Sequence, residues 1–157
     1  MVRHRLRTGS RKLGRKIGVQ AELARASGEA LPFRDASFDF VFSRVALPYM
    51  DISVAVAEMH RVLRPGGELW LTLHPMSMLS WTKALGSPKR TVFEAYRLAN
   101  TASLHFLGKQ FRYPLRRQRT ESYQTSEGMR RLLARQGFEN IHTQQDRHFL
   151  VTAQKRG

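Results

Sequence analysis

Three side chains that could accept a proton from a hydroxyl or an amine stand out in the sequence. His74 follows the apolar run Glu68–Leu73 and precedes a proline, so it lies at the end of a candidate strand. A lone histidine in that position is a candidate general base, because its ordinary pKa is close to neutrality. Tyr49 and His105 are further candidates. The six histidines include no pair at metal-ligand spacing and the chain has no cysteine, so we expect no metal site.

The elements that must position these side chains follow from the apolar pattern. Residues 38–43, "FDFVFS", have the aromatic and β-branched composition of a buried strand. Asp51 is a suitable N-cap for a helix whose apolar residues recur at helical spacing up to Pro65. Pro65 ends this helix, and Gly66-Gly67 allow the positive φ values of a tight reversal. The next strand, over 68–74, therefore returns beside the first through a right-handed crossover.

The remaining elements show that strands alternate with helices. The first is a short strand over 19–26, for which a helix is an open alternative. Two helices follow, one over about 88–107 capped by Ser87 and one from Thr125 or Ser126 to Gly137. The chain closes with an antiparallel strand pair over 139–144 and 147–154. This order is typical of an α/β fold, in which helices pack on the faces of a sheet.

The net charge of +15 is concentrated in two segments. Residues 1–17 contain seven basic residues, residues 109–120 contain five, and neither segment contains an acidic residue. Segments of this kind bind nucleic acid or anionic lipid, but more often they are solvated faces. No nucleic-acid recognition motif accompanies the charge. Nucleic acid is therefore the alternative partner and not the main one.

Four stretches of the sequence resemble one known family. "GEALPFRDASFDFVFSRVALPYMD" and "EMHRVLRPGGELWLTL" resemble the class I S-adenosylmethionine-dependent methyltransferases of the small-molecule, type 11-like group. "TSEGMRRLLARQGFENI" and "RHFLVTAQK" are similar to that family's closing helix and antiparallel strand pair. The resemblance covers roughly residues 18–74 and 121–155 and implies a Rossmann-like methyltransferase sheet.

The resemblance also implies that the cofactor is S-adenosyl-L-methionine, bound beyond the carboxyl ends of the strands. The first of these ends gives Ser27, Gly28 and Glu29 as cofactor-binding candidates. Family members commonly place an acid there that reaches the adenine amino group. Ser27 occupies the aligned position and could accept a weaker hydrogen bond. For Glu29, a solvated loop acid is the open alternative.

The second strand end gives Ser43, Arg44 and Val45 as cofactor-binding candidates, beside the methionine part and the transferred methyl group. Leu47 to Tyr49 would then approach the substrate. Arg44 could pair with a carboxylate of a ligand, or it could cap the strand end or face water. Residues 75–124 lie where the family places its substrate cover.

The family's glycine-rich loop and the acid that ends its second strand have no counterpart in this sequence. We therefore expect an N-terminally truncated sheet without its first two strands, through a late start codon, a truncated gene or a deletion. The expected organisation is a basic segment over 1–17 and a partial methyltransferase domain over 18–157, with 75–124 inserted as the cover. Loss of central strands would expose a sheet edge, so self-association is a further expectation.

The main hypothesis is S-adenosylmethionine-dependent methyl transfer to a small-molecule acceptor, and the sequence leaves open whether this chain is catalytically competent. The alternative is a non-catalytic remnant or a basic module that binds nucleic acid or another acidic partner. No apolar run reaches the roughly 18 residues of a membrane span. The absence of cysteine suits a reducing cytoplasm, so we expect a cytoplasmic location.

Overall fold

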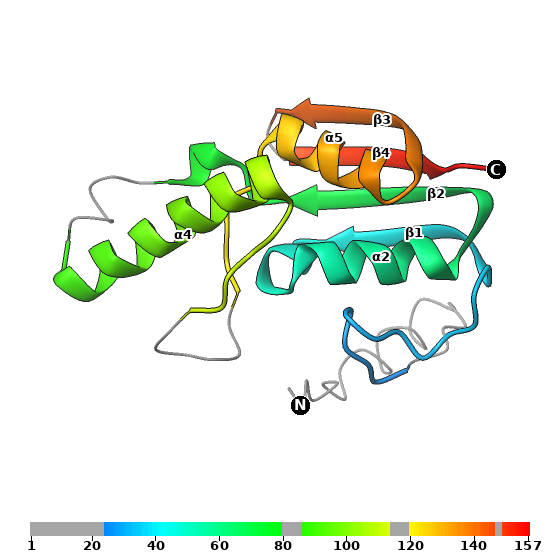
Figure 1. Ribbon diagram of the computed structural model, residues 1–157, viewed down its shortest axis with the longest axis horizontal. Coiled ribbons are helices and arrows are strands. Elements are labelled where there is room, and N and C mark those ends of the chain that lie inside the picture. The colour runs from blue at the N-terminus through cyan, green and yellow to red at the C-terminus, as the bar shows by residue number, and fades with distance from the viewer. Residues whose placement is uncertain (1–23, 80–85, 114–119, 147–148) are drawn as a thin grey trace, which may run out of the picture.

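The computed structural model describes residues 24–79, 86–113, 120–146 and 149–157. Four strands of this part form one sheet in the order β1-β2-β4-β3 (Figure 1). They are β1 (Phe38–Arg44), β2 (Leu63–Leu73), β3 (Phe138–Gln145) and β4 (Phe149–Lys155). β1 and β2 are parallel, whereas β4 is antiparallel to both β2 and β3. The predicted α/β sheet with a closing antiparallel strand pair is confirmed.

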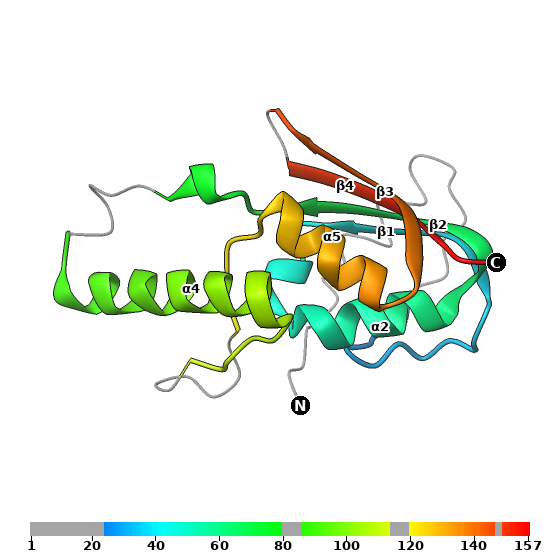
Figure 2. The same cartoon turned by 45° about the horizontal axis from the view of Figure 1, so that its top comes forward.

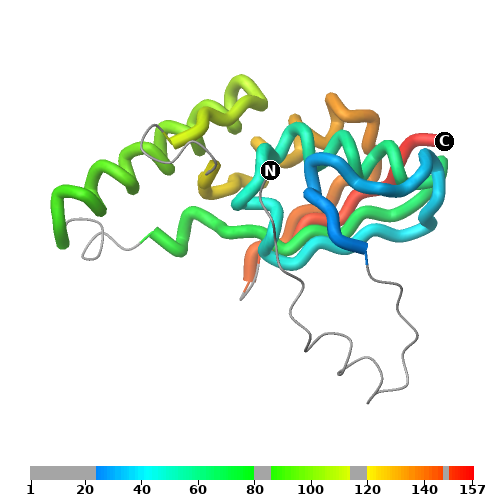
Figure 3. The backbone as a smooth tube through the Cα atoms, turned by 90° about the horizontal axis from the view of Figure 1, so that it is seen from below, coloured from blue at the N-terminus to red at the C-terminus, as the bar shows by residue number. Residues whose placement is uncertain are grey.

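Three α-helices and two short 3-10 helices connect these strands. The helices are α2 (Ile52–Val62), α4 (Pro88–Leu107) and α5 (Ser126–Arg135), and the 3-10 helices are η1 (Leu47–Tyr49) and η2 (Met76–Met78). α2 and α5 cover the same face of the sheet (Figures 2 and 3). α4 extends away from the sheet on the side toward which β1 and β2 point (Figure 1). None of the helices in the described ranges is long and apolar enough to cross a membrane.

The β1–α2–β2 crossover forms for the reasons that the sequence indicates. The Asp51 carboxylate accepts a hydrogen bond from the Val54 N–H at 3.3 Å and so caps α2. The helix ends at Val62, three residues before the predicted stop at Pro65. β2 begins at Leu63 instead of residue 68, so Pro65, Gly66 and Gly67 lie inside the strand. The positive φ predicted for both glycines occurs only at Gly66, where φ is 77°. Gly67 is needed for space instead, because a Cβ there would lie 2.9 Å from the Arg64 carbonyl oxygen.

The core lies between the sheet and the two helices that cover it. α2 buries five side chains toward β1 and β2, and α5 buries Met129, Leu132 and Leu133 toward the strand pair. Gly137, with φ at 88°, follows the end of α5 and lets Phe138 enter the core fully buried. Thr125 caps α5 by accepting from the Gly128 N–H at 3.1 Å. The closing helix and its strand pair therefore form as predicted.

The strand predicted over 19–26 is not formed in its described part. Residues 24–26 are exposed and have no strand partner, and residues 19–23 lie outside the described ranges, as does the basic segment 1–17. The nearest backbone pairing is the isolated bridge between Ser27 and Ala30, which closes a tight turn. Exposed alanines have no buried apolar face with which to hold a strand in a sheet, which accounts for the difference.

The sheet face opposite α2 and α5 is apolar and exposed along β1 and β2. Phe40, Phe42 and Trp70 alternate with buried core residues and are 49%, 53% and 40% exposed. The rings of Phe40 and Trp70 meet edge to face with centroids 5.8 Å apart. β1 is an outer strand of the described sheet, with a neighbour only on the β2 side. The structure thus has the exposed edge on which the expectation of self-association rests.

Candidate functional site

The carboxyl ends of β1 and β2 meet at one edge of the sheet. Arg44 lies opposite Thr72, and the Val45 N–H donates to the Thr72 carbonyl oxygen at 3.0 Å and to its Oγ1 at 3.1 Å. Ser43 is buried, while Arg44 and Val45 are exposed. Arg44 is exposed and makes no ion pair with another described residue.

Val45 has an unusual backbone conformation for its residue type. Its φ is 53°, in the left-handed region where a β-branched side chain is strained. Such strain persists only where the surroundings hold the residue in place, and it is concentrated at functional sites. The two hydrogen bonds to Thr72 provide that hold. The turn at Val45 directs the chain into η1, which buries Leu47 and Pro48 and brings Tyr49 over the end of β2.

Two of the three predicted proton acceptors lie together. The rings of Tyr49 and His74 meet edge to face, with centroids 5.5 Å apart and an interplanar angle of 89°. The His74 backbone exchanges hydrogen bonds with Gln124, whose Oε1 accepts from the His74 N–H at 3.0 Å and whose N–H donates to the His74 carbonyl at 2.9 Å. Burial lowers the pKa of His74, the charge of Arg97 lowers it further, and Glu121 partly opposes this. His74 is therefore a neutral imidazole near pH 7.

The third candidate, His105, has a different contact. Its Nδ1 lies 2.7 Å from Thr125 Oγ1, the side chain that caps α5. This contact joins the last turn of α4 to the first turn of α5. The imidazole is engaged in helix packing, and we assign His105 a structural role.

The first predicted cofactor-binding group, Ser27 to Glu29, forms a turn against the start of α2. Ser27 Oγ accepts from the Glu29 N–H at 3.2 Å. One oxygen of the Glu29 carboxylate accepts from the Asp51 N–H at 2.7 Å, so this side chain is tied to the start of α2. Gly28 lies against Met50, because a Cβ added at Gly28 would be 2.6 Å from the Met50 Sδ. The hydroxyl hydrogen of Ser27 remains as the polar group that this turn offers to a ligand.

Arg61 on α2 holds the segment that follows this turn. Its guanidinium donates to the Glu58 carboxylate at 2.8 and 2.9 Å, to Asp35 at 2.6 Å, and to the carbonyls of Leu31 and Phe33 at 3.0 and 2.8 Å. Hydrogen bonds from Arg61 and from the Leu31 N–H lower the pKa of Glu58 to about 2. One side chain on α2 thereby fixes the loop that leads from the first group into β1.

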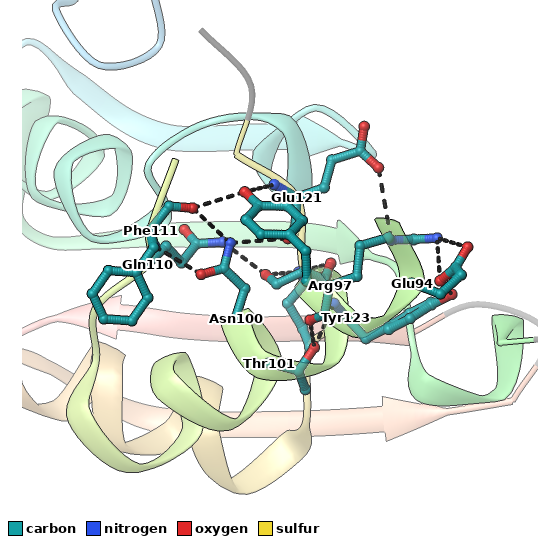
Figure 4. Close-up of polar contacts among 11 residues, drawn as sticks. Glu94, Arg97, Asn100, Thr101, Gln110, Phe111, Glu121 and Tyr123 are labelled. Carbon is teal, nitrogen blue, oxygen red and sulfur yellow. Dashed lines mark hydrogen bonds and ion pairs between the residues drawn. The ribbon is translucent and has the colours of Figure 1, made fainter. Parts of the chain in front are cut away.

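A buried charged cluster beside His74 has no counterpart in the sequence analysis. Arg97 on α4 is bound to Glu94 at 3.1 Å, lies 3.7 Å from Glu121, and stacks over the Tyr123 ring at 4.0 Å from its centroid (Figure 4). The three charged side chains are between 7% and 15% exposed. The Tyr123 hydroxyl donates to Glu94 at 3.0 Å, and burial raises the pKa of Tyr123 to about 12. The sequence offered no signal for this cluster.

A chain of hydrogen bonds connects the start of α2 to the end of β2. Gln110 Oε1 accepts from the Ile52 N–H at 2.9 Å, and Gln110 Nε2 donates to Ser122 Oγ at 2.7 Å. Ser122 Oγ also accepts from Gln124 Nε2 at 3.1 Å, and Gln124 holds His74 as described. The segment 120–124 is buried throughout. This chain gives the predicted cover segment a fixed place beside the two strand ends.

The residues at these strand ends fit the sulfonium end of S-adenosylmethionine better than its adenine end. A buried serine, a backbone turn and two aromatic rings lie at the β1 and β2 ends, whereas one oxygen of the Glu29 carboxylate is bound to the Asp51 N–H. Among the described residues, no group of three or more histidine, aspartate or glutamate side chains is placed to hold a metal ion.

Comparison with known sequences gives a consistent set of matches. Residues 3–71 match the family model described as a methyltransferase domain. A ubiquinone/menaquinone biosynthesis C-methyltransferase of Klebsiella pneumoniae is 35% identical over 107 residues, which are 66% of this chain and 37% of the relative. A malonyl-[acyl-carrier protein] O-methyltransferase of Erwinia billingiae is 50% identical over 42 residues, or 26% of this chain and 17% of the relative. The chain thus spans little more than a third of the Klebsiella relative.

Solved structures show the same fold. The chain is similar to a possible histamine N-methyltransferase of Thermotoga maritima, with a TM-score of 0.56 and 18% identity over 95% of this chain and 70% of that one. It is also similar to the 1,6-didemethyltoxoflavin-N1-methyltransferase of Burkholderia thailandensis, with a TM-score of 0.59 and 16% identity over 96% of this chain and 57% of that one. In its sheet topology and its sequence matches, the chain is similar to the class I S-adenosylmethionine-dependent methyltransferases.

Proposed function

We propose that this chain takes part in methyl transfer from S-adenosylmethionine to a small-molecule acceptor, at the carboxyl ends of β1 and β2. The observation that supports this most is the meeting of Tyr49 and His74 beside the strained turn at Val45. A proton acceptor, an aromatic wall and a fixed backbone turn converge there on one edge of a parallel strand pair, where ligands bind in open α/β sheets. The relatives named above are a C-methyltransferase of ubiquinone/menaquinone biosynthesis and an O-methyltransferase of malonyl-[acyl-carrier protein], and their methyltransferase activity supports the proposal.

In this proposal, Ser43, Arg44 and Val45 hold the methionine part of the cofactor, and Ser27 and Gly28 contact its adenosine part. When bound, the cofactor supplies a methyl group on a positively charged sulfur. Arg44 is exposed at that end and can pair with a carboxylate. Glu29 acts through another residue, because its carboxylate fixes the Asp51 N–H at the start of α2.

His74 accepts the proton that a hydroxyl or amine acceptor must lose. Its neutral imidazole is available near pH 7, because its pKa is lowered by burial and by Arg97. Tyr49 restricts the ring on one side, and Gln124 fixes the backbone at both its N–H and its carbonyl. A base positioned in this way contributes about 10²- to 10⁴-fold to a proton-transfer step.

The experiment is a calorimetric titration of the chain with S-adenosylhomocysteine. A saturable heat is expected, and the Val45→Trp variant should bind on the order of ten-fold more weakly, because the indole obstructs the end of β1. Val54→Trp is the matched control, since Val54 is also exposed but lies on α2. The absence of heat from the unaltered chain, or equal weakening by both variants, contradicts the proposed site.

A further inference from the structure

The outward side of α4 is apolar from Val92 to the end of the helix. Between Val92 and Leu107 every exposed residue of this helix is apolar. Val92, Ala95, Ala99, Ala102 and Phe106 repeat at intervals of three and four, so they form a single stripe, which we call the α4 apolar face. Its two ends, Val92 and Phe106, are 56% and 65% exposed, and Leu107 beside it is 62% exposed.

The polar residues of α4 point the other way. Glu94 and Arg97 belong to the buried cluster beside Tyr123, and Asn100 and Thr101 are buried against Phe111 and Tyr123. After its first turn, the helix is therefore amphipathic with its charges inside and its apolar side outside. Figure 1 shows α4 projecting from the body of the molecule, so this side is accessible along several turns. A continuous exposed apolar stripe of this kind marks an interaction surface.

Cationic side chains lie at both ends of the stripe. Lys89 and Arg90 are exposed in the first turn of α4, and no acidic residue accompanies them there. The first turn is the positive end of the helix dipole, so these cations do not stabilise the helix. Lys109 and Arg112 are exposed just after the helix ends at Gly108. Their positions are explained by an anionic partner that spans the length of α4.

A second copy of this chain is a poor fit to the surface. If two α4 helices packed along their apolar faces, either orientation would bring a cationic end of one against a cationic end of the other. Like charges in contact oppose such pairing, and each chain has a net charge of +15. A lipid surface with anionic headgroups fits both features, because it accepts apolar side chains between headgroups that pair with the flanking cations.

We propose that α4 docks on an anionic membrane surface, with Val92, Phe106 and Leu107 in the headgroup region and Lys89, Arg90, Lys109 and Arg112 paired to lipid phosphates. The helix lies on such a surface and does not cross it, in accordance with its alternation of buried polar and exposed apolar residues. The proposal does not depend on the methyl-transfer site, since none of these side chains belongs to it.

The test is co-sedimentation of the chain with vesicles of phosphatidylcholine, with and without phosphatidylglycerol. The double variant Val92→Gln/Phe106→Gln removes the apolar contact without changing charge and should lower partition into the anionic vesicles by about ten-fold or more. Val54→Gln, an exposed valine on α2, is the matched control and should bind as the unaltered chain does. Glutamine is a good helix former, and circular dichroism checks that α4 is retained.

A second pair of variants tests the charges. Lys109→Gln/Arg112→Gln should lower partition by about five-fold for each cation removed, whereas Arg34→Gln, elsewhere on the surface, should have little effect. Residues 1–17 are also basic, so binding of the unaltered chain alone would not be sufficient support. Unchanged binding by Val92→Gln/Phe106→Gln overturns the proposal. Equal binding of the unaltered chain to neutral and to anionic vesicles also overturns it. So does a dimer of the unaltered chain, formed without lipid, that Val92→Gln/Phe106→Gln disrupts.

Discussion

The imidazole of His74 and the phenol ring of Tyr49 meet edge to face, with centroids 5.5 Å apart, where β2 and η1 both end. His74→Gln should lower turnover by about 10²-fold or more if the imidazole accepts the proton. S-Adenosylhomocysteine affinity should be unchanged. Tyr49→Phe keeps the ring contact and should retain most of the activity. His105→Gln is the matched control, because that histidine contacts Thr125. Equal loss in the two histidine variants would contradict the assignment.

Two histidines with lowered pKa values, His60 and His74, make stability depend on pH. The pKa of His74 is lowered by burial and Arg97, and the pKa of His60 is lowered by burial and Lys155. Below about pH 6.5 the unfolded chain binds protons that the folded chain does not, so the free energy of unfolding falls as pH falls from 7 toward those lowered pKa values. Urea unfolding at several pH values should show this slope, and the double variant His60→Gln/His74→Gln should reduce it. A stability that rises on acidification through this range would contradict the buried neutral state.

The ion pair between Glu58 and Arg61 predicts a second, more acidic transition. The pKa of Glu58 is lowered to about 2, so its contribution is present above the ordinary value near 4.5 and is lost as pH falls from there toward 2. Glu58→Gln should remove this part of the acid sensitivity. Arg61→Lys should lower the melting temperature, because one ammonium cannot serve two carboxylates and two carbonyls at once. An unchanged acid-unfolding curve for Glu58→Gln would show that the pair is not coupled to folding.

Asn100 fixes the cover segment to α4. Its side chain donates to the carbonyls of Phe111 and Glu121 at 2.8 and 3.2 Å and accepts from the Phe111 N–H at 2.7 Å, and the residue is 1% exposed. Asn100→Ala leaves buried backbone groups without partners and should lower the free energy of unfolding by about 2–4 kcal/mol. Thermal and urea unfolding measure this. Ala99→Ser, one residue earlier on the exposed side, should change stability by less than about 0.5 kcal/mol.

The exposed face along β1 predicts concentration-dependent association. Phe40, Phe42 and Trp70 form an apolar patch beside an outer strand, and such an edge pairs readily with another chain. Phe40→Thr/Phe42→Thr keeps β propensity and should reduce association in sedimentation velocity. Val54→Thr leaves the patch intact and should not. A monomer at all concentrations, with or without the changes, would contradict this expectation.

Local signals explain why most of the fold could be predicted. The N-cap at Asp51, the proline at 65 and the glycines after it determine the crossover within a few residues of chain, and the pattern after Thr125 does the same for the closing unit. The predicted strand over 19–26 had no comparable signal. Its alanines favour a helix over a strand, so a strand there would depend on tertiary pairing.

The site depended on burial that the sequence does not display. No prediction was made for Arg97, Glu94 and Glu121, which are buried together because α4 and the segment 120–124 enclose them. His74 and Tyr49 could each be singled out by type and position, but their contact depends on the turn at Val45. A strained φ at a β-branched residue is a tertiary property, so no local pattern predicts it.

The most direct test of the central claim is a map of backbone amide shifts in the chain as S-adenosylhomocysteine is added. The account predicts that the largest changes fall on the amides of Ser43 to Val45, on Gly28 and on His74, with small changes along α5 and β3. Saturable shifts in that pattern would place the cofactor at the carboxyl ends of β1 and β2. Shifts confined to other elements, or none at saturating ligand, would contradict the claim that this edge of the sheet is the methyl-transfer site.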